Sequence, residues 1–349
     1  MPHPSVVEET LLFTLEDNAR NLTRVALDCD DAVQGGRRFR RTATGWTLGV
    51  PRPALNRVEY RLVVTAQGGG TSVVCDPGNP ERVDTGFGER SVALMPGYGR
   101  PAWVRREVEP GSLRELTHTD DELGDLPVGL WTPTGLGDTT PAPLLVAHDG
   151  PEYARLGDLT RFAAVQVTDG TLPPFRLALM QPRDRDAWYG ANPAYVAAEL
   201  AAVDLVAATV ATDRPLVVMG ASLGGLAALL VGMAAADTVG GVFAQSGSFF
   251  TPDLDPQEST YPYFEQVTAA VLGLPAASST NSLVVGMTCG RLEENWANNE
   301  AMAARLTDRG HRVRLTGLDD LHNFTAWRDG LDPALTDVLR AVWRYSRMD

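Results

Sequence analysis

The chain has 349 residues, of which 44% are hydrophobic and 21% charged, enough for one large and one small globular domain. Its formal net charge of −14 opposes binding to phosphate backbones and anionic lipids, so we expect neither nucleic acid nor a membrane as a partner. All 30 basic side chains are arginine, which excludes Schiff-base catalysis, a Ser–Lys dyad and the lysine of a phosphate-binding loop.

Short alternating runs of apolar and polar residues dominate the chain up to about residue 106. Runs such as Arg24–Asp28, Gly45–Val50 and Val58–Val64 are separated by Gly, Pro and Asn turns, which is typical of half-buried strands. A turn-dense segment over residues 76–101 follows them. The pattern predicts a small N-terminal β-sandwich, immunoglobulin-like, over residues 1–110.

The pattern changes over the second part of the chain. Val/Leu-rich runs such as APLLVAHDG, RPLVVMGAS and SLVVGMTCG suit strands that are buried on both faces of a parallel sheet. Helical stretches such as NPAYVAAELAAVDLVAATVA lie between several of these runs. Strand–helix alternation predicts a doubly wound, mostly parallel α/β domain over residues 111–349.

One segment of this domain, RPLVVMGASLGGLAALLVG, carries the first chemical signal. A predicted strand runs into Ser222 and a small-residue helix follows, with Gly220 and Gly224 on either side of the serine. This context distinguishes the G-x-S-x-G turn of α/β-hydrolases from an ordinary strand–helix turn rich in small residues. It predicts Ser222 as a nucleophile, with the Leu223 amide at the helix start facing the oxyanion.

The general base in such a domain follows the nucleophile in the chain, on the loop after the last strand. Of five histidines, only His322 has this order and placement; the alternative is a surface or core histidine.

The acid is expected between the serine and the histidine, after the strand SLVVGMTCG. The candidates there are Glu293, Glu294 and Glu300, with Asp319 or Asp320 further along. At least one of these glutamates is explained by a solvated helix start, and Glu293 ranks first.

Several motifs along residues 86–345 occur together in one known family. They are HDG after the strand APLLVA, R-x-x-W-Y-x-x-N at Arg185–Asn192, GASLGGLAAL, QSGSFF, G-x-x-E at Gly290–Glu293 and H-x-x-x-x-W-R at His322–Arg328. In these motifs the chain resembles the enterochelin esterase family, relatives of the esterase D and mycolyltransferase hydrolases. The resemblance implies a β-sandwich before the hydrolase domain and cytoplasmic hydrolysis of catecholate siderophore trilactones, often as ferric complexes. It also implies Ser222, His322 and Glu293 as the catalytic residues.

The chain departs from the family pattern at two places. Asp320 and Leu321 precede His322, where the family usually has two glycines. Pro151 follows the Asp-Gly of HDG, at the position expected to supply the second oxyanion amide, and proline has no N–H. Either Gly150 or Glu152 is therefore expected to donate in its place, or the oxyanion site is weakened.

Contacts to the substrate are predicted from residue type and loop position. A ferric catecholate is anionic, and Arg185 and Arg328 are the arginines beside the catalytic loops. Trp188, Phe249 and Trp327 could offer flat walls to catechol rings. The competing explanations are surface pairing for the arginines and core packing for the aromatic residues.

The sequence also bears on disulfides, location and cofactors. Three cysteines, widely spaced and odd in number, indicate no disulfide framework, and the start of the chain lacks the pattern of a secretory signal. These features predict a reducing, cytoplasmic location. The histidines show no metal-ligand spacing, so we expect no metal and no cofactor, with any iron arriving in the substrate. Nothing in the sequence indicates the oligomeric state.

Two other functions compete with siderophore hydrolysis. The first is an esterase of the same superfamily that acts on a feruloyl, acetyl or glutathione ester or thioester. The second is a non-catalytic binding protein with a degenerate hydrolase domain, an idea prompted by the sandwich and by Pro151.

Overall fold

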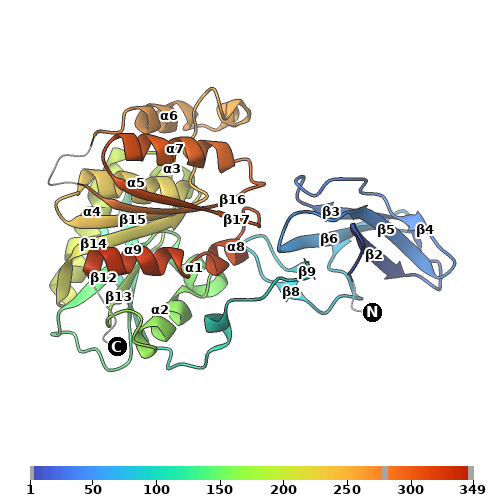
Figure 1. The fold of residues 1–349 in the computed structure, drawn as a ribbon, viewed down its shortest axis with the longest axis horizontal. Helices are drawn as coiled ribbons and strands as arrows, with labels where there is room; N and C mark the ends of the chain where they lie inside the picture. The colour runs from blue at the N-terminus through green and yellow to red at the C-terminus, as the bar shows by residue number, and fades with distance from the viewer. Residues whose placement is uncertain (1–3, 277–281, 345–349) are drawn as a thin grey trace. The chain divides into compact units, whose positions relative to one another are not determined.

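A computed structural model describes residues 4–276 and 282–344, and contacts within the chain group it into two units (Figure 1). The first unit comprises the chain up to Gly99 together with Asp319–Leu321, and the second comprises Arg100–Leu318 and the chain from His322 onward. The division therefore lies before the expected residue 110. The reason is Trp103, in the 3-10 helix η1 (Ala102–Arg105), which is buried edge-to-face against Phe162 in the core of the second unit.

The first unit consists of two antiparallel sheets. One has the order β1 (Ser5–Val7), β2 (Thr10–Glu16), β5 (Gly45–Pro51) and β4 (Arg40–Arg41). The other has the order β3 (Leu22–Cys29), β6 (Arg57–Ala66), β9 (Arg90–Leu94) and β8 (Arg82–Val83), with β7 (Thr71–Val74) on β6. Alternate residues of β2 are buried, and both sheets contribute to one core. The N-terminal antiparallel sheets expected from the sequence are confirmed; the immunoglobulin-like topology stays a prediction.

Three residues from far along the chain complete the first unit. The backbone carbonyl of Asp319 accepts a hydrogen bond from the Asn56 amide at 2.6 Å. The side chains of Asp320 and Arg57, each 2% exposed, form an ion pair with Nη2 2.8 Å from Oδ2. Leu321 is buried in the core of this unit. The side chains of Asp320 and Leu321, the two residues before His322, therefore belong to the first unit.

Breaking the buried ion pair is expected to destabilise the first unit. Replacing Asp320 by alanine removes the carboxylate 2.8 Å from the buried Arg57 guanidinium, whose Nε also lies 3.8 Å from Glu59 Oε1, and removal of one partner of a buried pair typically costs about 3–5 kcal/mol. Urea unfolding of the full chain measures the loss, and Asp319→Ala is the matched control, because Asp319 is exposed and bonds Asn56 through its backbone. Equal unfolding midpoints for the two variants would contradict the prediction.

The second unit is built on one eight-stranded sheet. Its order is β10 (Ser112–Asp120), β11 (Gly124–Thr132), β13 (Arg176–Met180), β12 (Ala142–Ala147), β14 (Thr212–Ala221), β15 (Val239–Gln245), β16 (Val284–Gly290) and β17 (Arg312–Leu318). The strand β11 is antiparallel to both of its neighbours, and the pairs from β13 to β17 are parallel. The carboxyl ends of β14 to β17 therefore meet at one edge of the sheet.

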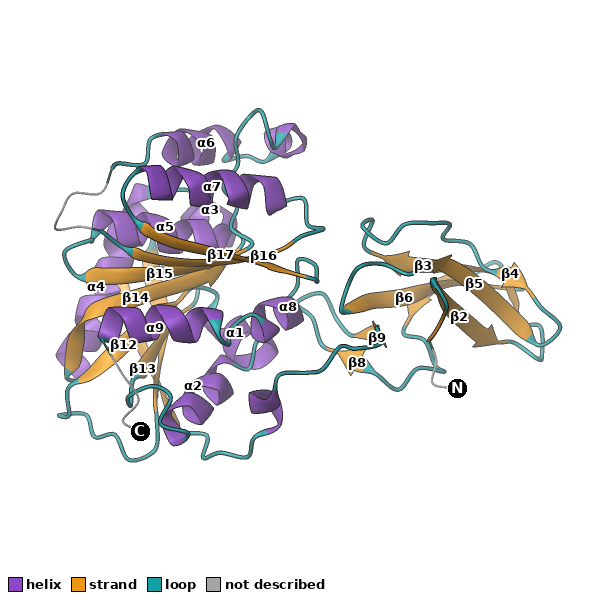
Figure 2. Ribbon diagram, viewed as in Figure 1, coloured by secondary structure: helices purple, strands orange, loops and turns teal. Residues whose placement is uncertain are grey.

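Helices cover both faces of this sheet (Figure 2). One core contains residues of α4 (Pro193–Thr209), α5 (Leu223–Ala234), α6 (Phe264–Leu272) and α7 (Trp296–Asp308). The other contains residues of α1 (Gly150–Leu156), α2 (Leu159–Thr168), α8 (Phe324–Asp329) and α9 (Ala334–Trp343). This arrangement confirms the expected doubly wound domain. None of the described helices is long and apolar enough to cross a membrane.

Candidate active site

Four loops meet at the carboxyl edge of the sheet. Ser222 directly follows β14, and Ser246 directly follows β15. Glu293 comes shortly after β16, and His322 shortly after β17. In open α/β sheets this edge is where ligands bind. Residues that are distant in the sequence are thus brought to one place by parallel neighbouring strands.

The turn at Ser222 is strained, as the G-x-S-x-G pattern requires. Ser222 has φ 56° and ψ −126°, a conformation that residues other than glycine adopt only when the surroundings enforce it. A Cβ on Gly220 would lie 2.2 Å from the carbonyl oxygen of Gly224, and one on Gly224 would lie 3.2 Å from Asp149 Oδ2. Gly220 is therefore needed for the strand and the helix to approach each other, and Gly224 lets the start of the helix lie close to Asp149.

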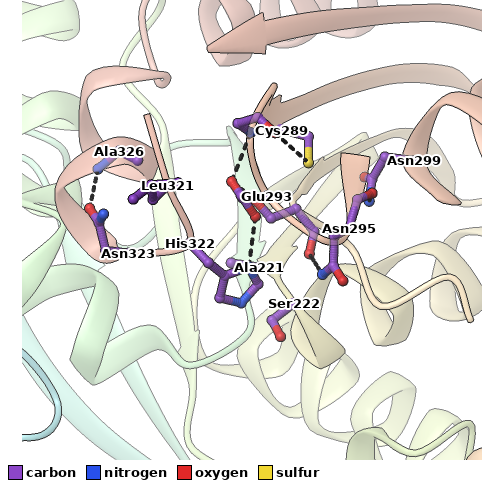
Figure 3. Close-up of polar contacts among 12 residues, drawn as sticks. Ala221, Ser222, Cys289, Glu293, Asn295, Asn299, Leu321, His322, Asn323 and Ala326 are labelled. Carbon is purple, nitrogen blue, oxygen red and sulfur yellow. Dashed lines mark hydrogen bonds and ion pairs between the residues drawn. The ribbon is translucent and has the colours of Figure 1, made fainter. Parts of the chain in front are cut away.

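The His322 side chain is oriented by a carboxylate. Its Nδ1 lies 2.8 Å from Oε2 of Glu293, and its ring packs edge-to-face on Trp327 at 5.0 Å. Figure 3 shows the ring between Glu293 and Ser222. Because a carboxylate only accepts, Nδ1 carries the hydrogen, and in the neutral imidazole Nε2 then has the lone pair that a general base needs.

The hydroxyl of Ser222 contacts a second serine in this structure. Its Oγ lies 3.3 Å from Oγ of Ser248, a buried residue whose amide also donates to the Ser222 carbonyl at 3.1 Å. Among the described residues no hydrogen bond joins Ser222 to His322. If Ser222 attacks a substrate, its hydroxyl must exchange the contact with Ser248 for one with a base.

Glu293 is buried and hydrogen-bonded, unlike the other carboxylates that the sequence offered as the acid partner of His322. Its Oε1 accepts hydrogen bonds from the Gly290 amide at 2.7 Å and from Ser246 Oγ at 2.9 Å. Glu294 and Glu300 are exposed, as is Asp319, and Asp320 is engaged by Arg57. Of the five candidates, the structure brings only Glu293 to His322.

Two predicted donors to the oxyanion lie at the starts of helices. Leu223 begins α5 and Gly150 begins α1, and the first amide of a helix has no acceptor within that helix. Neither amide donates a hydrogen bond within the parts of the chain that the structure describes. Pro151 follows Gly150 in the first turn of α1, so it leaves the Gly150 amide untouched.

His148, two residues before Gly150, forms a buried ion pair with Glu199. His148 Nε2 is 2.8 Å from Glu199 Oε2, His148 Nδ1 is 2.9 Å from the Met219 carbonyl, and neither ionisable side chain is exposed. Burial opposes the charged form of His148, but the Glu199 carboxylate outweighs it and raises the pKa of His148. His148 is thus tied into the sheet and is not a second candidate for the base.

The predicted substrate contacts are placed differently from the expectation. Trp188, Phe249 and Trp327 are 5%, 1% and 6% exposed and pack in the interior, so we do not propose them as pocket walls. Arg328 pairs with its neighbour Asp329, with Nη2 2.7 Å from Oδ1. The fifth predicted contact, Arg185, donates to Asp149. The competing explanations, packing and pairing with acids, account for these five side chains.

The sequence reasoning missed the residues that hold the turn after β15. Asn299 Nδ2 donates to the Gly247 carbonyl at 2.8 Å, and its Oδ1 accepts from the Gly247 amide at 3.1 Å. Asn295 Nδ2 donates to the Ser246 carbonyl at 2.9 Å. Their spacing of four places both side chains on one face of the turn into α7, and that is the signal that the run NWANN contained.

The sheet order, the antiparallel β11 and a serine at a strained turn between β14 and α5 define the α/β-hydrolase class of proteins. A family model described as "Esterase: Putative esterase" matches residues 124–338, and the chain belongs to this family. This match bears out the resemblance stated from the sequence.

Three individual proteins illustrate what the chain is similar to. The iron(III) enterobactin esterase of Dickeya dadantii is 30% identical over 283 residues, which cover 74% of this chain and 63% of that protein. The enterobactin esterase of Shigella flexneri, crystallised in the presence of enterobactin, has a TM-score of 0.77 at 21% identity over 97% of this chain and 95% of that one. The ferric enterobactin esterase of Salmonella typhimurium has a TM-score of 0.78 at 23% identity over 95% and 93%. The alignment thus spans less than two thirds of the Dickeya protein, and the two crystal structures share the fold.

Proposed function

We propose that this protein is a serine esterase that hydrolyses the ester bonds of a catecholate siderophore trilactone. The observation that carries the esterase proposal is the Glu293–His322 hydrogen bond of 2.8 Å at the same sheet edge as Ser222. The substrate class is supported by the relatives, which are named for enterobactin and its iron(III) complex. The cytoplasmic location stays a prediction.

The proposed reaction is acyl transfer through Ser222. His322 Nε2 takes the Ser222 proton as Oγ attacks the ester carbonyl, and the amides of Leu223 and Gly150 stabilise the oxyanion. His322 then gives the proton to the departing alcohol. Water, deprotonated by the same nitrogen, attacks the acyl-enzyme and releases the acid with Ser222 restored. Glu293 keeps Nδ1 protonated and stabilises the imidazolium in both halves.

Product analysis tests the proposal. The full chain is incubated with cyclic and linear enterobactin, with and without iron, beside p-nitrophenyl and feruloyl esters, and Ser222 is probed with a fluorophosphonate. We expect labelling of Ser222 and release of dihydroxybenzoylserine units. Hydrolysis confined to the feruloyl or p-nitrophenyl esters would overturn the siderophore substrate. An intact trilactone together with an unlabelled Ser222 would favour the binding protein instead.

The hydrogen bonds around Glu293 predict that removing Ser246 lowers kcat more than removing the N–H of Trp327. Trp327 Nε1 donates to Ser246 Oγ at 3.1 Å, and Ser246 donates to Glu293 Oε1. Ser246→Ala removes a hydrogen bond to a charged group and should lower kcat by about 10- to 100-fold. Trp327→Phe keeps the ring against His322 and removes only the N–H, so a loss of about 3- to 10-fold is expected.

Because Trp327 acts through Ser246, the double variant should lose no more activity than Ser246→Ala alone. Trp103→Phe is the matched control, since the buried Trp103 indole nitrogen has no hydrogen-bond partner in the described parts of the chain. Initial rates on a p-nitrophenyl ester measure all four variants. Additive losses would show that Trp327 acts independently of Ser246.

A further inference from the structure

One guanidinium joins the loop of Gly150 to the turn of Ser222. Arg185, the first residue of α3 (Arg185–Tyr189), donates from Nε to Asp149 Oδ1 at 3.0 Å and from Nη2 to Asp149 Oδ2 at 2.8 Å. The same Nη2 lies 3.3 Å from the carbonyl oxygen of Ala221. Asp149 immediately precedes Gly150, and Ala221 immediately precedes Ser222.

We propose that Arg185 is a positioning residue that fixes the spacing of the two oxyanion amides, and that it is not a binding site for the substrate's charge. The inference rests on the proposed function, because it concerns the amides of Gly150 and Leu223. The Arg185 guanidinium holds Asp149, the residue before the Gly150 amide, and also contacts the carbonyl of Ala221, two residues before the Leu223 amide. Small displacements of such donors are costly in rate, since they act only where the oxyanion forms.

The surroundings of Asp149 support a positioning role. Asp149 has φ 49°, a left-handed conformation that a residue other than glycine keeps only when several contacts enforce it. Its amide donates to the Tyr189 hydroxyl at 3.1 Å, and Arg185 lies over the Tyr189 ring at 5.5 Å. Its carboxylate, 8% exposed, packs on Gly224 in the first turn of α5. Without Arg185 this carboxylate would lose its counter-charge beside the nucleophile.

Charge argues against the expected role in binding an anion. The Asp149 carboxylate already neutralises the Arg185 guanidinium through two-point contact, so the pair offers little net charge to a catecholate. Lysine carries the same charge but cannot form the planar fork. Arg185→Lys therefore separates the two roles, because charge is retained while the geometry is lost.

The test compares esters that differ in charge. The full-length variants Arg185→Lys and Asp149→Asn are assayed on neutral p-nitrophenyl acetate and on the anionic mono-p-nitrophenyl ester of succinic acid, with melting temperatures as a check of folding. We expect kcat to fall by about 10- to 100-fold for both variants on both esters, with KM changed less than about twofold. Arg183→Lys is the matched control, because Arg183 is exposed, pairs with Asp125 and should leave both esters unaffected.

Each outcome has a separate meaning. A loss confined to the anionic ester, or seen in KM alone, would assign Arg185 to substrate binding and overturn the inference, as would an unchanged kcat in Arg185→Lys. If Arg185→Lys does not fold, the same comparison of kcat with KM is made on Asp149→Asn, which keeps the shape of the side chain. A wild-type chain that cleaves neither ester and leaves Ser222 unlabelled by a fluorophosphonate would overturn the proposed function itself.

Discussion

Replacing Ser222 by alanine is expected to lower kcat for ester hydrolysis by about 10⁴- to 10⁶-fold, because no covalent intermediate can form. The amides of Leu223 and Gly150 would remain, so a residual rate above that in water should persist. Fluorophosphonate labelling should disappear in the same variant. Initial rates on a p-nitrophenyl ester and mass spectrometry of the labelled chain measure the two effects.

A second hydroxyl near Ser222 makes the control informative. Ser248 Oγ lies only 3.3 Å from Ser222 Oγ, so loss of activity alone would not show which oxygen attacks. Ser248→Ala should retain labelling of Ser222 and lose far less activity than Ser222→Ala. Labelling that survives in Ser222→Ala and disappears in Ser248→Ala would make Ser248 the nucleophile and contradict the proposed mechanism.

Replacing Glu293 by glutamine is expected to lower kcat by about 10³- to 10⁴-fold with little change in KM. The structure gives a specific reason. The Gly290 amide and the Ser246 hydroxyl both donate to Oε1, so they would hold the glutamine carbonyl at that position. The NH₂ group would then face Nδ1 of His322, which would have to accept. The proton would move to Nε2, and the nitrogen facing Ser222 could no longer act as a base.

Glu294→Gln is the matched control for this variant. It makes the same substitution one residue along the chain, at an exposed side chain, and should leave kcat unchanged. Steady-state kinetics of the two variants on the same ester give the comparison. A larger loss in Glu294→Gln than in Glu293→Gln would exclude Glu293 as the acid partner of His322.

The departures from the family pattern now have separate physical explanations. Asp320 pairs with Arg57 and Leu321 packs in the core of the first unit, so both residues before His322 take part in the structure of that unit. Pro151 lies within α1 after Gly150, and it takes away an N–H that the Gly150 amide can replace. Neither departure removes a group that the proposed acyl transfer uses.

Local features of the sequence were sufficient to predict the class of fold and to indicate Ser222 as the candidate nucleophile. Buried strands and small-residue helices are recognised from short apolar runs, because the period of burial is a local property. The strained turn at Ser222 is also local, since Gly220 permits a close approach to the Gly224 carbonyl that a Cβ would prevent. The candidacy of His322 followed from chain order, which the topology of a doubly wound sheet imposes.

Only the tertiary structure shows which side chains contact His322 and Arg185. Glu293 and Glu294 are alike in the sequence, and only burial with its hydrogen-bond donors directs one of them to His322. Arg185 finds its carboxylate 36 residues away, so a contact that neutralises it could not be read from local composition. The aromatic side chains expected at the pocket pack in the interior. The sequence shows that these residues are apolar, but only the folded chain determines what each of them contacts.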